Sequence, residues 1–549
     1  MTRARVPGGR RVAALVALAA LLAAAPAAAQ YFGQNKVQVR RPAWRVIESD
    51  HFLVHYPDGL DSLGLRVLDL AEKTDELFAR RLGHRLGRRV PIVLYGSHHD
   101  FTETNVTTEL LDASTAGFTE VLHNRVVLPF TGSYEDLRHV VVHELSHAYL
   151  FDLLYGGAAG RLLAEGSFFA PPLWFAEGLA EHLSLGMEPD AEMFLRDGIV
   201  AGYLPPLERS GGYLVYKQGQ SAVGWLVARH GEERLRRLLR ELRRARGFDR
   251  AFERVMGMPV RRFDEQWRDA LRRAYWPEVA VRRDPERFAR QLTDHRRDGS
   301  AFNTAPAISP QGDRIAWFSD RRQYTDVYVM SAYDGKVLRR LVRGERDVHF
   351  EAIPSFRSAI TWSPDGRRLA LVAKSGGRDV LVVVAAADGR VLRRLRLDCD
   401  ALAFPAWSPV TDSLVVTGIR DGRADLWLVD AGTGRAERLT DDAWDEKEAC
   451  WTPDGRTVTF ASDRAAPVVL RPERDPAGFG RYGLYDLDLA GRGVTPRVDG
   501  PGDVHAPAWS PDGRKLAYIS DRGGAADILL LDTADGSVTQ LTEVLGGIS

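Results

Sequence analysis

The stretch "WSPDGRRLALVAKS", residues 362–375, decides how the second half of the chain folds. Its Pro-Asp-Gly segment is typical of a tight turn, because proline presets φ, aspartate bonds back to the backbone and glycine accepts φ > 0. Segments with the alternation of β-strands flank the turn on both sides. The stretch therefore predicts two antiparallel strands joined by a short connection.

Related stretches recur along the second half of the chain. Further copies begin at Ile308, Trp407, Trp451 and Trp509, and neighbouring copies are spaced 44 to 58 residues apart. The copies are followed by a later strand such as "DLWLVD", and two of them also by a closing "RLT" at 438–440 or "QLT" at 540–542. Four short strands in 40 to 50 residues are typical of one blade of a β-propeller.

The repeated sequence resembles the propeller of TolB-like proteins over about residues 290–549. That resemblance implies six blades, whereas five copies of the turn motif are present. "QLT" at 291–293 resembles the last strand of a further blade, and "QLTEVLGGIS" ends where a sixth unit would begin. We therefore expect residues 281–298 to form a linker and first propeller strand. Residues 299–549 are expected to form a propeller that is incomplete at its C-terminus, because an open ring leaves unpaired strand edges.

Residues 30–280 have a different pattern. Strand-like segments at 51–57 and 89–96 enclose a helical segment at 61–83, and residues 117–130 are predicted to be a strand pair or one long strand. Several amphipathic helices follow. A small sheet followed by helices indicates an α+β domain, so the whole chain is predicted to be multidomain.

The motif "HVVVHELSHAYL", residues 139–150, carries two histidines four residues apart. On a helix, His143 and His147 lie on one face and can direct two imidazoles at a single ion. Glu144 follows the first histidine, which completes the H-E-x-x-H arrangement of zinc peptidases. Ser133 is a candidate N-cap for this helix. A buried helix with two satisfied imidazoles is the alternative interpretation.

A third ligand is expected in "PPLWFAEGLAEHL", residues 171–183, where two prolines suit a helix start. Glu177 is the predicted ligand, and Gly178 beside it permits a close helix approach. Glu181 lies one turn later on the same face, where it can accept the N–H of a ligand histidine and orient its ring. Glu181 itself and His182 are the alternative ligands.

Together, "HELSH" and "WFAEGLAEH" resemble the gluzincins, zinc metallopeptidases with a glutamate as third ligand, and "YKQGQSAVGWLVARHG" resembles their peptidase-MA-like branch. The resemblance covers roughly residues 45–275 and implies a zincin-like domain that hydrolyses peptides. It also implies a substrate-binding strand within residues 124–130, for which Asn124, Arg125, Val126 and Val127 are the candidates. Tyr216, with Tyr213 behind it, is the candidate for oxyanion support. The G-x-M-E-N motif of related aminopeptidases is missing, which favours an endopeptidase.

The predicted cofactor is one Zn²⁺ ion, which polarises the scissile carbonyl and lowers the pKa of water toward ~7. Glu144 is predicted to take the water proton and pass it to the leaving amine. A competing hypothesis is an envelope adaptor with an inactive peptidase-like domain. Structural zinc is a weaker third hypothesis, since two histidines and one glutamate leave a coordination position open.

The N-terminus predicts export. Basic residues precede the apolar segment 12–29, and Ala27-Ala28-Ala29 fits a cleavage site, so 1–29 is predicted to be a signal peptide. A membrane anchor is the alternative, but the apolar core before Pro26 is shorter than the roughly 20 residues that span a bilayer. We therefore expect a periplasmic or extracellular protein of a bacterial envelope, with no transmembrane helix after cleavage. Its partners are expected to be a peptide or protein substrate and, through the propeller, an envelope protein.

The amino-acid composition narrows the classes of protein to which the chain can belong. Lys plus Arg and Asp plus Glu are both 74, so the net charge of zero gives no reason to expect a nucleic-acid partner. Apolar residues make up 45% of the chain and charged residues 27%, which is typical of globular proteins. Cys399 and Cys450 are the only cysteines. They could form a disulfide or be two buried thiols.

Overall fold

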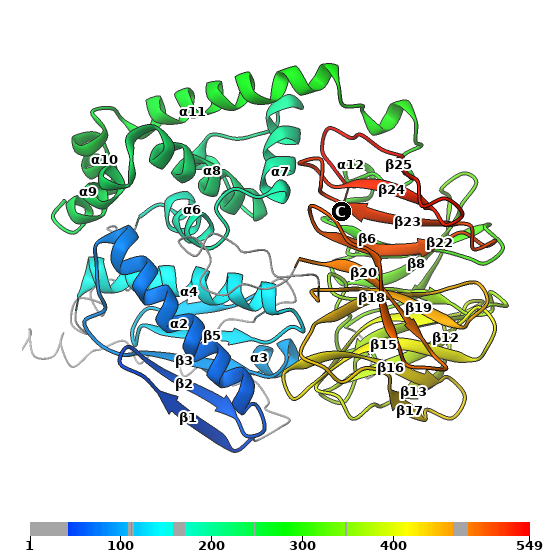
Figure 1. Cartoon of the computed structure of the whole chain (residues 1–549). Helices are drawn as coiled ribbons and strands as arrows, with labels where there is room; N and C mark the ends of the chain where they lie inside the picture. The colour runs from blue at the N-terminus through cyan, green and yellow to red at the C-terminus, as the bar shows by residue number, and fades with distance from the viewer. Residues whose placement is uncertain are drawn as a thin grey trace, which may run out of the picture.

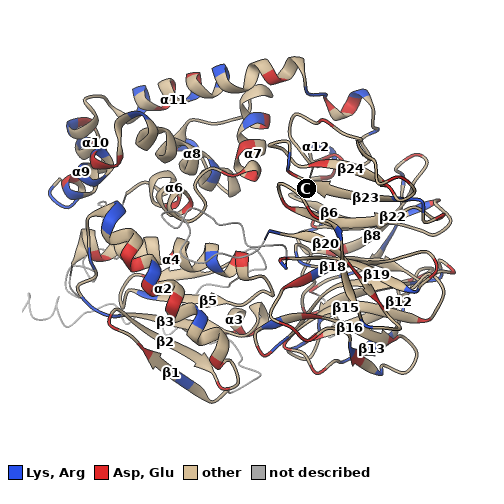
Figure 2. Ribbon diagram, viewed as in Figure 1, with Lys and Arg blue, Asp and Glu red and all other residues tan. Residues whose placement is uncertain are grey.

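The computed structural model describes residues 42–107, 111, 115–156, 171–245, 247–345, 349–464 and 481–548. The predicted signal peptide, residues 1–29, lies outside these residues. The described chain has an N-terminal domain of mixed helices and strands and a C-terminal β-propeller, which lie side by side (Figure 1). Acidic and basic residues are interspersed along both parts (Figure 2), as the net charge of zero leads one to expect. Among the described helices, none combines the length and apolar character needed to cross a bilayer.

The N-terminal domain is built on a five-stranded sheet with the order β1-β2-β3-β5-β4. The three inner strands are parallel, and both outer strands run antiparallel to their neighbours. The segment 117–130, predicted as a strand pair or one strand, is the antiparallel pair β4 and β5. The strands are β1 Trp44–Glu48, β2 Phe52–Pro57, β3 Val90–Tyr95, β4 Phe118–Glu120 and β5 Arg125–Pro129.

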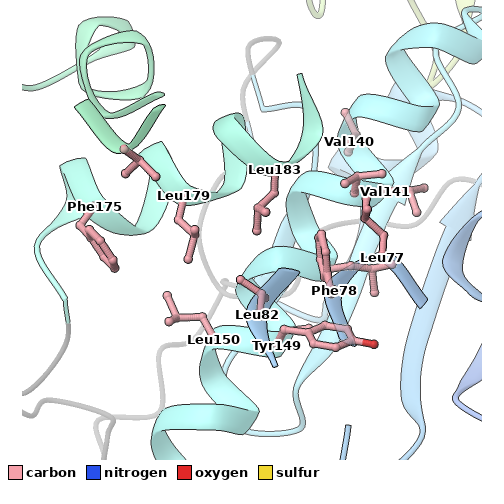
Figure 3. Close-up of a cluster of buried hydrophobic side chains, with 14 of the residues drawn as sticks. Leu77, Phe78, Leu82, Val140, Val141, Tyr149, Leu150, Phe175, Leu179 and Leu183 are labelled. Carbon is pink, nitrogen blue, oxygen red and sulfur yellow. The ribbon is translucent and has the colours of Figure 1, made fainter. Parts of the chain in front are cut away.

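Two long helices, α2 and α4, pack against this sheet and against each other. Figure 3 shows their shared core, in which Phe78 of α2 and Tyr149 of α4 make an edge-to-face contact, with Leu179 of α6 nearby. The helices of the domain are α2 Asp61–Leu82, α3 His98–Thr102, α4 Tyr134–Tyr155, α6 Leu173–Ser184, α7 Pro189–Val200, α8 Tyr213–His230, α9 Glu232–Leu242, α10 Phe248–Met256 and α11 Val260–Tyr275. The short 3-10 helix η1 is Leu207–Arg209.

The helices α6 and α8 meet backbone to backbone. A Cβ atom added to Gly178 would lie 2.2 Å from the carbonyl carbon of Gly219, and one added to Gly219 would lie 2.1 Å from the carbonyl oxygen of Trp174. Both distances are far below van der Waals contact, so each position requires glycine. The close approach expected at Gly178 is therefore present, and its partner is α8.

The propeller has five four-stranded antiparallel sheets, one for each copy of the turn motif. The first two blades are β6 Asn303–Ile308, β7 Arg314–Ser319, β8 Asp326–Ser331 and β9 Val337–Val342, then β10 Thr361–Trp362, β11 Arg368–Lys374, β12 Asp379–Ala385 and β13 Val391–Leu395. The third blade is β14 Ala401–Trp407, β15 Ser413–Arg420, β16 Arg423–Asp430 and β17 Ala436–Arg438. The last two are β18 Glu446–Trp451, β19 Thr457–Ser462, β20 Gly483–Asp488 and β21 Val494–Val498, then β22 Val504–Trp509, β23 Lys515–Ser520, β24 Asp527–Asp532 and β25 Val538–Gln540.

The repeated tryptophans and glycines of the motif have identifiable roles. Gly366 has φ +66° and donates its N–H to the Ser363 carbonyl, which closes the turn between β10 and β11. The indole N–H of Trp362 donates to the Ala307 carbonyl of the preceding blade, and Trp451 does the same to Ala406. The motif therefore shapes each hairpin and also joins neighbouring blades.

The described strands form five sheets, as many as the copies of the turn motif, whereas the resemblance implied six blades. The expectation of a first propeller strand within 281–298 was wrong, because this segment holds the short helices η3 Pro285–Arg287 and α12 His295–Asp298 after η2 Trp276–Ala280. "QLT" at 291–293 is not part of a strand, and Leu292 packs against the cluster of Trp317, Tyr328 and Met330 in the first blade. Cys399 and Cys450 are both free thiols.

The propeller holds the N-terminal end of α4. The Asp445 carboxylate accepts the backbone N–H of Tyr134, the first residue of the helix, and the Tyr134 hydroxyl donates to the Gly422 carbonyl. The Ser133 hydroxyl caps the helix by accepting the Asp136 N–H, as its N-cap position predicted, and Tyr482 of the propeller donates to that same hydroxyl.

Replacing Asp445 is expected to loosen the contact between the two parts. Asp445→Ala removes the acceptor for the Tyr134 N–H, and loss of a helix cap of this kind costs about 1–2 kcal/mol. Asp445→Asn keeps an acceptor and is expected to cost less. Thermal unfolding measures both. Asp398→Ala is the control, since Asp398 is 87% exposed and pairs only at the surface with Arg420. Equal losses for Asp445→Ala and Asp398→Ala would contradict the capping role.

Gly178→Ala is expected to destabilise the N-terminal domain by about 3 kcal/mol or more, because the added carbon overlaps the backbone of α8. Gly224→Ala, on the same α8, is the matched control. Its Cβ would meet the His182 ring at 3.4 Å and Met187 at 4.0 Å, both ordinary van der Waals contacts, and alanine raises helix propensity by up to ~1 kcal/mol. Urea unfolding followed by circular dichroism compares the two, and a Gly178→Ala protein as stable as the Gly224→Ala protein would refute the close contact.

Candidate metal centre

The helix α4 places His143 and His147 on one buried face. Their side chains are 10% and 11% exposed, and the two Nε2 atoms lie 3.2 Å apart. The four-residue spacing produces this convergence, as the motif predicted. Two imidazole nitrogens directed at one point can serve a metal ion.

Glu177 on α6 completes a triangle of donor atoms. Its Oε2 lies 3.2 Å from His143 Nε2 and 3.3 Å from His147 Nε2. Zinc bound tetrahedrally at ~2.0–2.1 Å keeps its ligand atoms about 3.3 Å apart. Three donors with these separations, two of them imidazole nitrogens and one a carboxylate oxygen, therefore fit a zinc ion.

A second group, His139, His143 and Glu181, also lies close enough to hold a metal among the described residues. Glu181 Oε1 is 2.9 Å from His139 Nε2 and 3.0 Å from His143 Nδ1. Its other oxygen is already paired with the Lys217 ammonium at 3.2 Å. A cation placed there would meet a fixed positive charge, so the first group is the better site and Glu181 supports it from behind His143.

The alternative third ligands are occupied elsewhere. His182 directs its Nε2 at the Arg81 guanidinium, 3.0 Å away. Glu181 contacts His139, His143 and Lys217, as described above. Glu177 is the remaining candidate from the glutamate helix, and its carboxylate is the one that reaches both His143 and His147.

The charges in the cluster act on each other strongly. Burial would lower the pKa of His143, but its contacts with Glu177 and Glu181 outweigh burial and raise that pKa to about 10. Burial would raise the pKa of Glu177, yet the two imidazoles beside it hold that pKa at about 2. Without a metal, the pair is therefore a buried imidazolium and carboxylate, and positive charge at this point is electrostatically favoured.

Glu144 lies beside this triangle and is held by strand β4. Thr119 donates its hydroxyl to Glu144 Oε2 at 2.7 Å and also contacts the Glu144 carbonyl at 2.9 Å. Glu144 is only 6% exposed. A Cβ on Gly117, the residue before this strand, would come within 3.2 Å of the Glu144 side chain. The carboxylate is thus fixed between α4 and the sheet edge.

Of the two candidate tyrosines, only Tyr216 reaches the cluster. Its ring stacks near His143 with the centroids 6.1 Å apart. Burial and the nearby Glu177 and Glu144 carboxylates raise the pKa of Tyr216, so its hydroxyl keeps its proton and can donate it in a hydrogen bond. Tyr213 is 51% exposed, and its hydroxyl donates to Asp190, away from the histidines.

The predicted substrate strand is corrected by the sheet order. Strand β5 lies between β3 and β4, so Val126 and Val127 are paired on both sides and fully buried. Asn124 is buried and donates to the Ala148 carbonyl of α4, and Arg125 pairs with Glu120. Strand β4 is one of the two edge strands of the described sheet, the other being β1, and it is β4 that lies beside Glu144.

Sequence reasoning missed three residues of the site. His139 precedes His143 by four residues, so its place on the same helix face was visible in the spacing. Lys217 and Thr119 carried no such signal, since each is brought to the site by packing of distant elements.

The propeller matches a known family. Residues 361–471 match the family model described as "TolB beta propeller domain". An uncharacterised protein of Agrobacterium fabrum is 31% identical over 224 residues, which are 40% of this chain and 69% of that protein. These matches support a TolB-like β-propeller in the second half of the chain. The residues that match the family model lie wholly within the propeller and do not include the metal centre.

Other relatives share shorter segments. A Tol-Pal system protein TolB of Novosphingobium aromaticivorans is 32% identical over 16% of this chain, and an uncharacterised peptidase of Bacillus subtilis is 31% identical over 18%. The chain spans only 17% and 14% of those two proteins. A solved structure described as putative TolB from Agrobacterium tumefaciens aligns with 44% of this chain and 80% of that one, at 22% identity and a TM-score of 0.35.

Purified protein is expected to bind one zinc ion per chain. His147→Ala and Glu177→Ala each remove one corner of the donor triangle and are expected to abolish stoichiometric binding, measured by metal analysis after dialysis. His505→Ala is the control, because His505 lies in the propeller and pairs with Glu448. Full zinc retention in both site variants would show that the triangle is not the metal site.

Proposed function

We propose that the N-terminal domain is a gluzincin-type zinc metallopeptidase and that the propeller binds a partner or substrate for it. The observation that carries the proposal is the donor triangle of His143, His147 and Glu177, with its separations of 3.2 to 3.3 Å. Two groups beside it add to the case, since Glu144 lies next to the triangle and Glu181 lies behind His143.

Each residue has a distinct task in the proposed hydrolysis. Zinc held by the three donors would supply a Lewis acid for the scissile carbonyl and would acidify an attacking water molecule. Glu144 takes the proton of that water and returns it to the leaving amine, acting first as base and then as acid. Thr119 holds the Glu144 carboxylate with a hydrogen bond of 2.7 Å to Oε2. Tyr216 is the candidate donor to the oxyanion.

Strand β4 gives the proposal a substrate direction. An extended peptide can pair with the free edge of β4 and would then lie beside Glu144, with main-chain hydrogen bonds supplying affinity. A peptide bound as an added strand is held along its middle and needs no free terminus, which favours an endopeptidase over an exopeptidase. The predicted export signal at residues 1–29 supports a location of the proposed reaction outside the cytoplasm, in the bacterial envelope.

A non-catalytic envelope adaptor is the second candidate. The observation that favours it is that the family match is confined to the propeller, and some relatives carry the name of a Tol-Pal system protein. An adaptor requires neither a general base nor a metal. Activity and metal content therefore separate the two functions.

Glu144→Gln is expected to retain zinc and to reduce hydrolysis of casein by at least about 10²-fold, the usual contribution of a general base. The readout is release of acid-soluble peptide, with metal content measured on the same samples. Chelator-treated wild type, restored by added zinc, is the positive control. Unchanged hydrolysis in Glu144→Gln would remove the assignment of the base, and zinc-replete wild type without any hydrolysis would favour the adaptor.

A further inference from the structure

Lys217 is a buried cation that the proposed reaction does not use. Its side chain on α8 is 4% exposed, and its ammonium lies 2.6 Å from Glu188, 3.2 Å from Glu181 and 3.6 Å from Asp190. A lysine is rarely buried to this extent unless it is paired. None of its three contacts is with an atom of the donor triangle. Any role in the centre must therefore pass through Glu181.

Glu181 divides its two oxygens between two kinds of partner. Oε1 is shared by His143 Nδ1, at 3.0 Å, and His139 Nε2, at 2.9 Å. Oε2 is taken by the Lys217 ammonium. A carboxylate can rotate about its terminal torsion, which is soft. With Lys217 on one oxygen, the other is held toward the back of the His143 ring.

The orientation matters because imidazole has two distinct nitrogens. A neutral histidine that donates from Nδ1 must present its lone pair at Nε2, and in His143 the Nε2 atom belongs to the donor triangle. Partners behind a ligand histidine that fix its tautomer and ring orientation typically change metal affinity by ~10–100-fold.

We propose that Lys217 is a positioning residue that acts through Glu181 to fix the ring of His143 for metal binding. This inference rests on the proposed zinc centre. The packing of the helices makes the arrangement possible, because the Gly178–Gly219 contact brings Glu181 of α6 within reach of Lys217 of α8.

A purely structural role is the competing explanation for Lys217. Its shortest contact is with Glu188, which precedes α7 at the N-cap position, so the ammonium also ties α8 to the start of α7. If this tie were its whole purpose, losing Glu188 and losing Lys217 would have similar effects. A role through Glu181 predicts that only the loss of Lys217 reaches the metal.

A double-mutant cycle on the full-length chain separates these roles. The zinc dissociation constant is measured by chelator competition for wild type, Lys217→Met, Glu181→Gln and the double variant. Lys217→Met is expected to weaken zinc binding by ~10–100-fold in the wild-type background. In the Glu181→Gln background the same change is expected to alter binding by less than about threefold, because the two residues act in series.

A control variant, Glu188→Gln, and a spectroscopic measurement complete the test. Glu188→Gln is expected to leave the zinc dissociation constant within about threefold of wild type. Lys217→Met, but not Glu188→Gln, is expected to shift the visible absorption of the Co²⁺-substituted protein, which reports ligand geometry. Should Lys217→Met not fold, Lys217→Arg takes its place in the cycle, because it keeps the charge and changes the donor geometry.

The outcomes distinguish this inference from the proposed function. Equal loss of affinity from Lys217→Met in both backgrounds, or an equal loss from Glu188→Gln, would overturn the positioning role while leaving the peptidase intact. A coupled cycle in a protein that binds zinc and hydrolyses nothing would support the positioning role and refute the peptidase. Wild type that binds no zinc would overturn both.

Discussion

The contact between Gly178 and Gly219 is the constraint on which the metal centre depends. It allows α6 and α8 to touch backbone to backbone. One residue before Gly178 is the ligand candidate Glu177, and three residues after it is Glu181. On the facing helix, Tyr216 and Lys217 lie just before Gly219. A single close approach therefore sets the distances among four functional side chains, and any Cβ at the contact would separate all of them together.

The other half of the centre is positioned from the propeller. The helix α4 carries both histidines and Glu144, and its first turn is bound by Asp445, Tyr482 and Gly422. Ile419 and Ala424 of the propeller also belong to the hydrophobic core of the N-terminal domain. The propeller is thus packed into the domain that holds the site. Motion of one relative to the other would displace α4, the helix that carries the candidate metal ligands His143 and His147.

The spacing of residues along the sequence predicted which side chains share a helix face. It did not predict which distant segments pack or pair with one another. The positions of His143 and His147 follow from helical periodicity, and Glu177 with Glu181 follows from the same rule on a second helix. The turn motif predicted every blade that the structure describes.

The substrate-binding strand was predicted at residues 124–127, whereas the strand at the sheet edge beside Glu144 is β4. Strand order depends on which segments pair across the sheet, and no local sequence pattern encodes that pairing. The expectation of six blades came from the resemblance to TolB-like propellers, whereas the number of turn-motif copies equals the number of described propeller sheets. Lys217 and Thr119 could not be found, since tertiary packing alone brings them to the centre.

The buried charges bear on whether the centre is active or a relic. Lys217, Glu181 and His143 form a buried ionic chain, and replacing such groups by apolar residues of similar size is often neutral or stabilising by ~1–4 kcal/mol. The fold itself therefore gains little from keeping them. A domain kept only as a scaffold has little physical reason to enclose a lysine, two glutamates and two histidines between three helices, α4, α6 and α8. A domain that must present two imidazoles and a carboxylate to one ion does have a physical reason to enclose these groups. The energetic cost of this cluster is itself an argument for a working metal centre rather than an inactive adaptor domain.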